Sequence, residues 1–140
     1  VQPGNFVDKK ANILGLHSGI VFYTIGQRHG LKISAAHPLY VTQINAKNNQ
    51  VSVGQRLYVY KSEFMLKDVH FLGQPFKKKI EIKVRIRYNH KEARAVVYPH
   101  KDRLRVIFKQ PQFALTPGQS AVFYVKKMVL GGGIIQKVID

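Results

Sequence analysis

Hydrophobic and polar residues alternate strictly between Ile80 and Tyr88. The two sets are hydrophobic Ile80, Ile82, Val84, Ile86 and Tyr88, and polar Glu81, Lys83, Arg85 and Arg87. Successive side chains of a β-strand point to opposite faces, so this pattern predicts a strand with one buried face and one basic, solvated face. Like charges on one strand face repel each other, a cost that favours a polyanion as the partner of this face.

Strand-like runs separated by turn residues continue through the second half of the chain. The same alternation returns where Leu104, Val106 and Phe108 are interleaved with Arg103, Arg105 and Lys109. The predicted strands are Phe64–Phe71, Ile80–Tyr88, Ala93–Tyr98, Leu104–Phe108, Ala121–Lys126 and Gly133–Val138. Five or six short strands of this kind predict a small antiparallel β-barrel, and its two basic stripes could form one surface.

The first part of the chain is turn-rich and contains little helix, at most a turn or two within Ser18–Thr24. Leu39–Ile44 and Gln50–Val53 flank an Asn-rich connection and predict a hairpin. We therefore expect an all-β protein with two domains. A small central β domain covers residues 1–61, and a five- to six-stranded antiparallel barrel covers residues 62–140.

The charge balance narrows the choice of partner. Among 140 residues, 23 are Lys or Arg and 7 are Asp or Glu, which gives a net charge of +16. Such an excess favours nucleic acid, because neutralised phosphates release their counterions. An anionic membrane or a sulfated polymer would also be attracted by this positive charge, but membrane-surface proteins usually place such charge on an amphipathic helix. With no long apolar run in the sequence, we expect a soluble, cytoplasmic protein without membrane contact.

Residues for catalysis are scarce. The chain has no Cys, its seven acids are scattered, and its six His lack the spacing of metal ligands, so we assign no catalytic residue, no metal and no cofactor to it. Leu130–Gly133 lacks the Gly-Lys-Ser/Thr ending of a phosphate loop and is predicted to mark a bulge or a close backbone crossing. Thr116–Gln119 predicts a type II turn. In this turn Gln119 either faces water or holds its amide beside the basic surface.

Several segments, in order, resemble the tRNA-specific 2-thiouridylases (tRNA-uridine 2-sulfurtransferases). The segments are Gly15–Gly19, Tyr23–Leu31, Pro38–Val41, Arg85–Tyr88, Pro111–Gln112, Thr116–Tyr124 and Leu130–Ile135. Together they extend from about Pro3 to Ile135. Each is weak alone, but their order and spacing make the resemblance to the central and C-terminal regions of that family specific.

The resemblance implies a function for a longer protein. Enzymes of this family use ATP to activate the wobble uridine of certain tRNAs and replace its 2-oxygen with sulfur held on a cysteine persulfide. The family's nucleotide-binding loop and catalytic cysteines would precede Val1, so we expect the 140 residues alone to bind tRNA and to be inactive. Implied partners are tRNA, the chain's own N-terminal catalytic domain and a sulfur-relay protein, with ATP and Mg bound in that missing domain.

The family's tRNA contacts match three positions, Arg87, Tyr88 and Gln119. Arg85 and Lys83 join them as candidates because they share the basic strand face with Arg87. Strict alternation turns Tyr88 toward the core unless the strand ends or bulges there. Arg28, in the family's Gly-Gln-Arg segment, either contacts RNA or braces a domain interface.

Two segments depart from the family pattern. Asp8–Asn12 lacks the usual Gly, which leaves Asn12 as the residue best suited to a left-handed conformation. Val125–Val129 replaces a more acidic, Gly-containing hairpin turn.

Two other functions fit the same charge. The barrel could be a structural module that docks on the catalytic domain or on a sulfur-relay protein. It could also be a free-standing translation-type barrel that binds ribosomal RNA, a reading that leaves the Gly-Gln-Arg and Pro-Gly-Gln segments unexplained.

Overall fold

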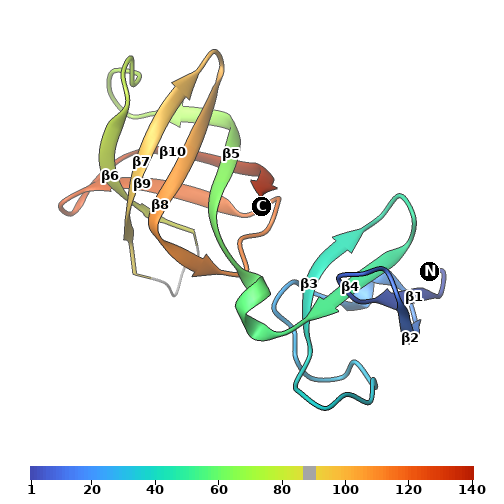
Figure 1. Ribbon diagram of the computed structural model, residues 1–140. Coiled ribbons are helices and arrows are strands. Elements are labelled where there is room, and N and C mark those ends of the chain that lie inside the picture. The colour runs from blue at the N-terminus through green and yellow to red at the C-terminus, as the bar shows by residue number, and fades with distance from the viewer. Residues whose placement is uncertain (87–90) are drawn as a thin grey trace. The chain divides into compact units, whose positions relative to one another are not determined.

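The computed structural model describes residues 1–86 and 91–140, which form two compact units, Val1–Tyr60 and Lys61–Asp140 (Figure 1). Both units consist of β-strands, as predicted, and the division falls one residue before the expected boundary. In the described residues no helix is long and apolar enough to cross a membrane.

The first unit is a four-stranded sheet with the order β2-β1-β4-β3. Its strands are β1 (Gly4–Val7), β2 (Ile13–His17), β3 (Tyr40–Asn45) and β4 (Gln50–Gly54). The predicted hairpin is confirmed as β3 and β4, while β1 pairs with β4 in parallel. Two 3₁₀ turns, η1 (Ile20–Phe22) and η2 (Arg56–Val59), complete the unit, and η1 lies where a helical turn was expected.

A small hydrophobic core holds this sheet together. Its buried members are Phe6, Leu31, Val41, Val51 and Val53. His17 is also buried, and its ring stands edge-on to Phe6 at 5.6 Å between centroids. His17 Nδ1 accepts the Gly19 N–H at 3.1 Å, so Nε2 is the protonated nitrogen and donates to the Asn49 carbonyl at 2.8 Å. This histidine is part of the core of the sheet.

The turn between β1 and β2 differs from the prediction. Ala11, not Asn12, takes the left-handed conformation, with φ of +65°. The Asp8 carboxylate explains the difference, because it accepts hydrogen bonds from the Lys10 and Asn12 N–H groups and from the Asn12 side chain. Asn12 is fixed by these bonds, and they also lower the pKa of Asp8. The positive φ therefore falls one residue earlier.

The second unit is a closed six-stranded barrel with the order β10-β5-β8-β7-β6-β9 (Figure 1). Its strands are β5 (Tyr60–Phe71), β6 (Ile80–Arg85), β7 (Ala93–His100), β8 (Arg103–Phe113), β9 (Ser120–Val125) and β10 (Met128–Ile139). Each contains all or most of a predicted strand. Closure leaves no unpaired edge, which stabilises a sheet of this size.

Alternation along the strands fills the barrel interior, with Phe64, Leu66, Val97, Val106 and Phe123 among its buried residues. Gly131 and Gly132 lie where β10 crosses its two neighbours, and a Cβ there would overlap the carbonyl oxygens of His70 and Ala121. The strand register also shifts at this glycine run. The predicted bulge and close backbone crossing are therefore confirmed.

Candidate nucleic-acid interface

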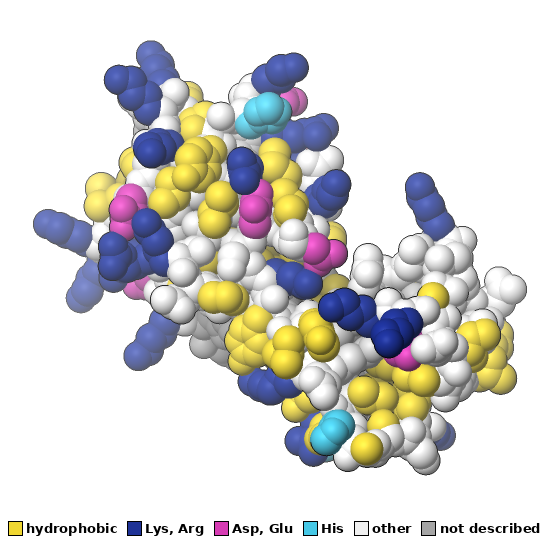
Figure 2. Space-filling view, viewed as in Figure 1, with side chains coloured by type: hydrophobic (Ala, Val, Ile, Leu, Met, Phe, Trp, Pro, Cys, Tyr) yellow, Lys and Arg dark blue, Asp and Glu magenta, His cyan; other side chains and the backbone are white. Residues whose placement is uncertain are grey.

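The outer face of three adjacent strands, β6, β7 and β8, is rich in basic side chains. On β6, Ile82 and Val84 are buried while Lys83 is exposed, which confirms the predicted alternation over the described part of that strand. We call this surface the basic wall and define it by Glu81, Lys83, Arg85, Arg94, Arg103, Arg105 and Lys109. The two basic stripes of the sequence are separated only by β7, which adds Arg94 between them. Figure 2 shows Lys and Arg side chains spread over the barrel with acidic side chains between them.

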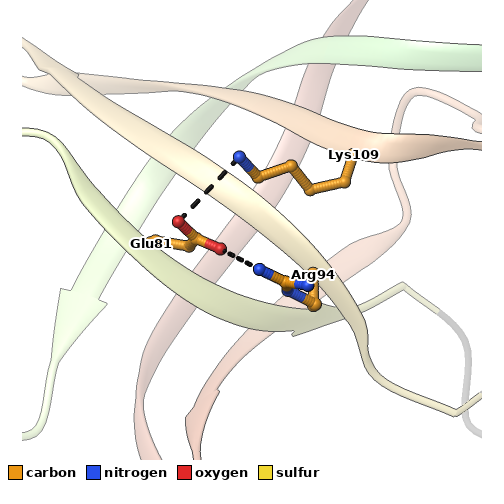
Figure 3. A network of polar contacts seen from close by, with 3 residues as sticks. All are labelled: Glu81, Arg94 and Lys109. Atoms are coloured by element: carbon orange, nitrogen blue, oxygen red, sulfur yellow. Dashed lines mark hydrogen bonds and ion pairs between the residues drawn. The ribbon is translucent and has the colours of Figure 1, made fainter.

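Part of this positive charge is neutralised within the wall (Figure 3). Glu81 accepts a hydrogen bond from Arg94 at 2.6 Å, and its second oxygen lies 3.9 Å from Lys109 Nζ. The Arg94 hydrogen bond, followed by the charge of Lys109, lowers the pKa of Glu81. A single carboxylate from β6 thus links cations of β7 and β8.

Arg105 has a partner of its own. Its Nε donates to Glu63 at 2.5 Å, and its guanidinium lies 5.8 Å from the ring centroid of Tyr98 on β7. Two carboxylates therefore pair with three wall cations, Arg94, Arg105 and Lys109. The two predicted candidates on β6, Lys83 and Arg85, form no ion pair within the described residues.

Arg85 contacts the aromatic ring of Tyr124, and Lys83, also on β6, is the register partner of the same residue. Arg85 donates to the Tyr124 hydroxyl and its guanidinium lies 5.0 Å from the ring centroid, so the side chain is stacked in place. Lys83 is exposed and stands in register with Arg94 on one side and Tyr124 on the other. This corner offers a held guanidinium, an exposed ammonium group and an aromatic ring to a ligand.

Gln119 lies in the turn that precedes β9. Gly118 takes φ of +94°, as the predicted type II turn requires, and the Gln119 N–H donates to the Thr116 carbonyl at 3.2 Å. The Gln119 side-chain oxygen accepts the Thr116 N–H at 3.0 Å. This bond orients the amide, and the Nε2 donor has no partner among the described residues.

Arg28 belongs to a separate feature in the first unit. Its neighbour Gln27 braces the loop, accepting the Thr24 N–H and donating to the His29 carbonyl, both at 3.0 Å. Arg28 itself is exposed and lines a hollow of about 730 Å³ formed by residues 28–39. Within the Gly-Gln-Arg segment, Gln27 is therefore the residue that braces the loop, and Arg28 contributes its charge to the lining of the hollow.

The structure gathers some of the predicted residues and leaves others apart. Lys83 and Arg85 share the basic wall, whereas Gln119 lies at the end of the barrel where β6 ends and β9 begins. Arg87 and Tyr88 lie outside the described residues. Arg94 was missed by sequence reasoning, although its position between the buried Ala95 and the half-buried Ala93 is the same alternating signal that identified Lys83.

Two family descriptions match the two units. Residues 1–55 match the tRNA methyl transferase PRC-barrel domain, and residues 61–135 match the aminomethyltransferase beta-barrel domain. The chain is thus of the class of proteins that join these two β domains.

Similar proteins identify the family. The chain is 50% identical to tRNA-specific 2-thiouridylase MnmA of Clostridium beijerinckii over 99% of its own length, and 49% identical to the protein of the same name in Acetivibrio thermocellus over 97%. It covers 39% and 38% of those two relatives. The chain belongs to the tRNA-specific 2-thiouridylase family and corresponds to its C-terminal part.

Proposed function

We propose that this chain is the tRNA-binding part of an enzyme that thiolates the 2-position of the wobble uridine of tRNA. The observation that supports it best is the basic wall, which continues over three adjacent strands beside the Arg85–Tyr124 stack. Lys and Arg point charges hold the phosphate backbone, while stacked rings and held amides contact bases or riboses. The wall would hold the backbone, and Gln119 would offer its Nε2 donor to a base edge or a ribose.

The chemistry is proposed to lie in the rest of the enzyme. A persulfide requires a cysteine, and these 140 residues contain none. ATP-dependent activation of the uridine and sulfur transfer would therefore be performed by protein outside this segment, with sulfur supplied by a relay protein. The segment alone is expected to bind tRNA and to catalyse nothing.

The test is tRNA binding across a salt series, with an unrelated duplex RNA of equal length for comparison. Preference for a tRNA with a wobble uridine that survives moderate salt would support recognition by this segment. Equal, steeply salt-dependent binding of both RNAs would contradict selective binding and reduce the segment to a basic cradle.

Two lysines on opposite sides of the barrel provide the matched variants. Lys83→Ala removes an exposed charge from the wall, and Lys137→Ala removes an exposed charge from β10, which lies three strands from β7 in either direction around the barrel. Lys83→Ala should make the slope of log K against log salt shallower by about one unit, while Lys137→Ala should not change it. Equal slopes for the two variants would contradict a contact at the wall. The same shallower slope is expected of Arg87→Ala, on the sequence argument alone.

A further inference from the structure

Three connections at one end of the barrel carry basic residues that are distant from one another in the sequence. Neighbouring strands are antiparallel, so the connections 72–79, 101–102 and 126–127 all lie at the end opposite to Gln119. In Figure 1 the 72–79 connection and the β7–β8 hairpin lie at the top of the barrel, and the β9–β10 turn projects at its left side. We call the basic residues of these connections the lysine rim, which comprises Lys77, Lys78, Lys79, Lys101, Lys126 and Lys127.

The rim differs from the wall in its charge balance. All six lysines are exposed, and within the described part of the chain none forms an ion pair. The three connections contain one acidic residue, Asp102. The wall, in contrast, pairs three of its cations with Glu81 and Glu63. Among the described residues, the positive charge of the rim is therefore less compensated than that of the wall.

Backbone conformation supplies an independent observation. Lys101 takes φ of +57° and Lys126 takes φ of +55°, both in the left-handed region where hairpin turns prefer Gly, Asn or Asp. A lysine gains no local hydrogen bond in this conformation and therefore makes each turn less stable than Asn would. Two of the connections thus place a lysine where the backbone conformation favours Gly, Asn or Asp, so an Asn substitution there can remove the charge without destabilising the turn.

We propose that the lysine rim is a second contact for the phosphate backbone of RNA, separate from the wall and from the Gln119 turn. This inference rests on the proposed function, that the chain binds tRNA. Lysine is a flexible point charge, suited to phosphate without fixed geometry, whereas arginine gives the planar, two-pronged contact used for specific recognition. The rim would therefore add affinity for RNA without selecting its sequence.

At the two turns, replacing the lysine is expected to raise stability and to lower RNA affinity, and the test measures both. Lys101→Asn combined with Lys126→Asn removes two charges and places a residue that tolerates a positive φ at both positions. We expect the melting temperature of the 140-residue chain to rise by a few degrees while tRNA affinity falls several-fold. The slope of log K against log salt should become shallower by about two units. Because the fold becomes more stable, misfolding cannot explain the lost affinity.

Two controls separate strain from charge. Ala11→Asn relieves a positive φ of +65° in the first unit without changing charge, and should raise the melting temperature with an unchanged salt slope. Lys137→Thr removes one charge from β10 and should leave the slope unchanged. A triple variant, Lys77→Ala with Lys78→Ala and Lys79→Ala, repeats the test at a connection without a strained residue and should make the slope shallower by up to about three units.

The outcomes distinguish this inference from the proposed function. If both rim variants keep the full slope while Lys83→Ala makes it shallower, tRNA binds the wall and the rim proposal is wrong. The rim proposal would also be wrong if the rim variants kept their tRNA affinity and an acidic protein bound the rim instead. If the unsubstituted chain does not bind tRNA, the proposed function itself fails.

Discussion

The two ends of the Gln119 side chain have different surroundings. Its oxygen accepts the Thr116 N–H within the turn, and its Nε2 donor has no partner among the described residues. Gln119→Glu keeps an acceptor for that N–H but replaces the donor with a negatively charged oxygen, which RNA phosphates repel. We expect stability within about 0.5 kcal/mol of the unsubstituted chain and weaker tRNA binding. Urea unfolding and tRNA titration measure the two effects.

Gln119→Ala is the complementary variant. It leaves the half-buried Thr116 N–H without its acceptor, which should cost roughly 1 kcal/mol of unfolding free energy. If Gln119→Glu binds tRNA as tightly as the unsubstituted chain, the amide is a turn residue alone and has no contact with RNA.

At the scale of elements, the glycine run of β10 decides whether the barrel can close. Gly131→Ala would place a Cβ against the His70 carbonyl at a position with φ of +147°, so both the neighbouring strand and the local backbone oppose it. We expect a loss of roughly 2–4 kcal/mol in unfolding free energy. Gly73→Ala is the control, since no atom of the described residues lies within 4 Å of the Cβ it would add. Thermal or urea unfolding compares the pair, and similar stability would contradict a closure role.

The link between β6, β7 and β8 through Glu81 gives a pH-dependent prediction. The pKa of Glu81 is lowered in the folded chain, so its contribution to stability is present above the unfolded value, near 4.3, and is lost as pH falls through the lowered folded value. Glu81→Gln should therefore reduce the melting temperature at pH 7, and the difference should disappear well below pH 4. A difference that persists at low pH would contradict this role for the carboxylate.

The same variant should bind RNA more tightly. Removing the carboxylate adds one net positive charge and releases Arg94 and Lys109 from their shared partner. The expected result is a higher tRNA affinity and a steeper salt slope. Asp68→Asn, which makes the same charge change at an exposed position on β5, is the control and should have a smaller effect.

Prediction from sequence succeeded where each strand has one buried and one solvated face. On β6 and β8 the alternation is strong, and the pattern identified both strands and their basic faces. Prediction from sequence failed for β2, because this strand has no alternating pattern. Only His17 is buried, and the strand's hydrophobic residues Ile13, Leu14 and Leu16 are all exposed. β1 lies between β2 and a parallel β4 far away in the chain, a pairing that depends on tertiary contacts.

The candidate site was predictable to a similar extent. Lys83 and Arg85 follow from the period of two, and the Gln119 turn follows from its Pro-Gly sequence. The ion-pair partner of each charged residue could not be predicted from the sequence. The register between β6 and β7 brings Glu81 near Arg94, which is thirteen residues away in sequence. The placement of the six rim lysines at one end of the barrel likewise depends on the strand order.

At the scale of the whole molecule, each unit has a core made of its own residues. The first core contains residues between Phe6 and Val53, and the barrel core contains residues between Phe64 and Ile135. Val51→Ala and Val97→Ala are matched substitutions of fully buried valines, one in each core. Each should cost roughly 2 kcal/mol, from lost burial and an incompletely filled cavity.

Hydrogen exchange resolved by peptide should show which of the two units is destabilised by each substitution. Val51→Ala is expected to speed exchange in β1, β3 and β4 and leave the barrel strands protected, while Val97→Ala should do the reverse. Loss of protection in both units from either substitution would mean that the two cores unfold as one. If the barrel stays protected in Val51→Ala, its wall and rim remain intact, and any loss of tRNA affinity in that variant would then be due to the first unit, where Arg28 lies.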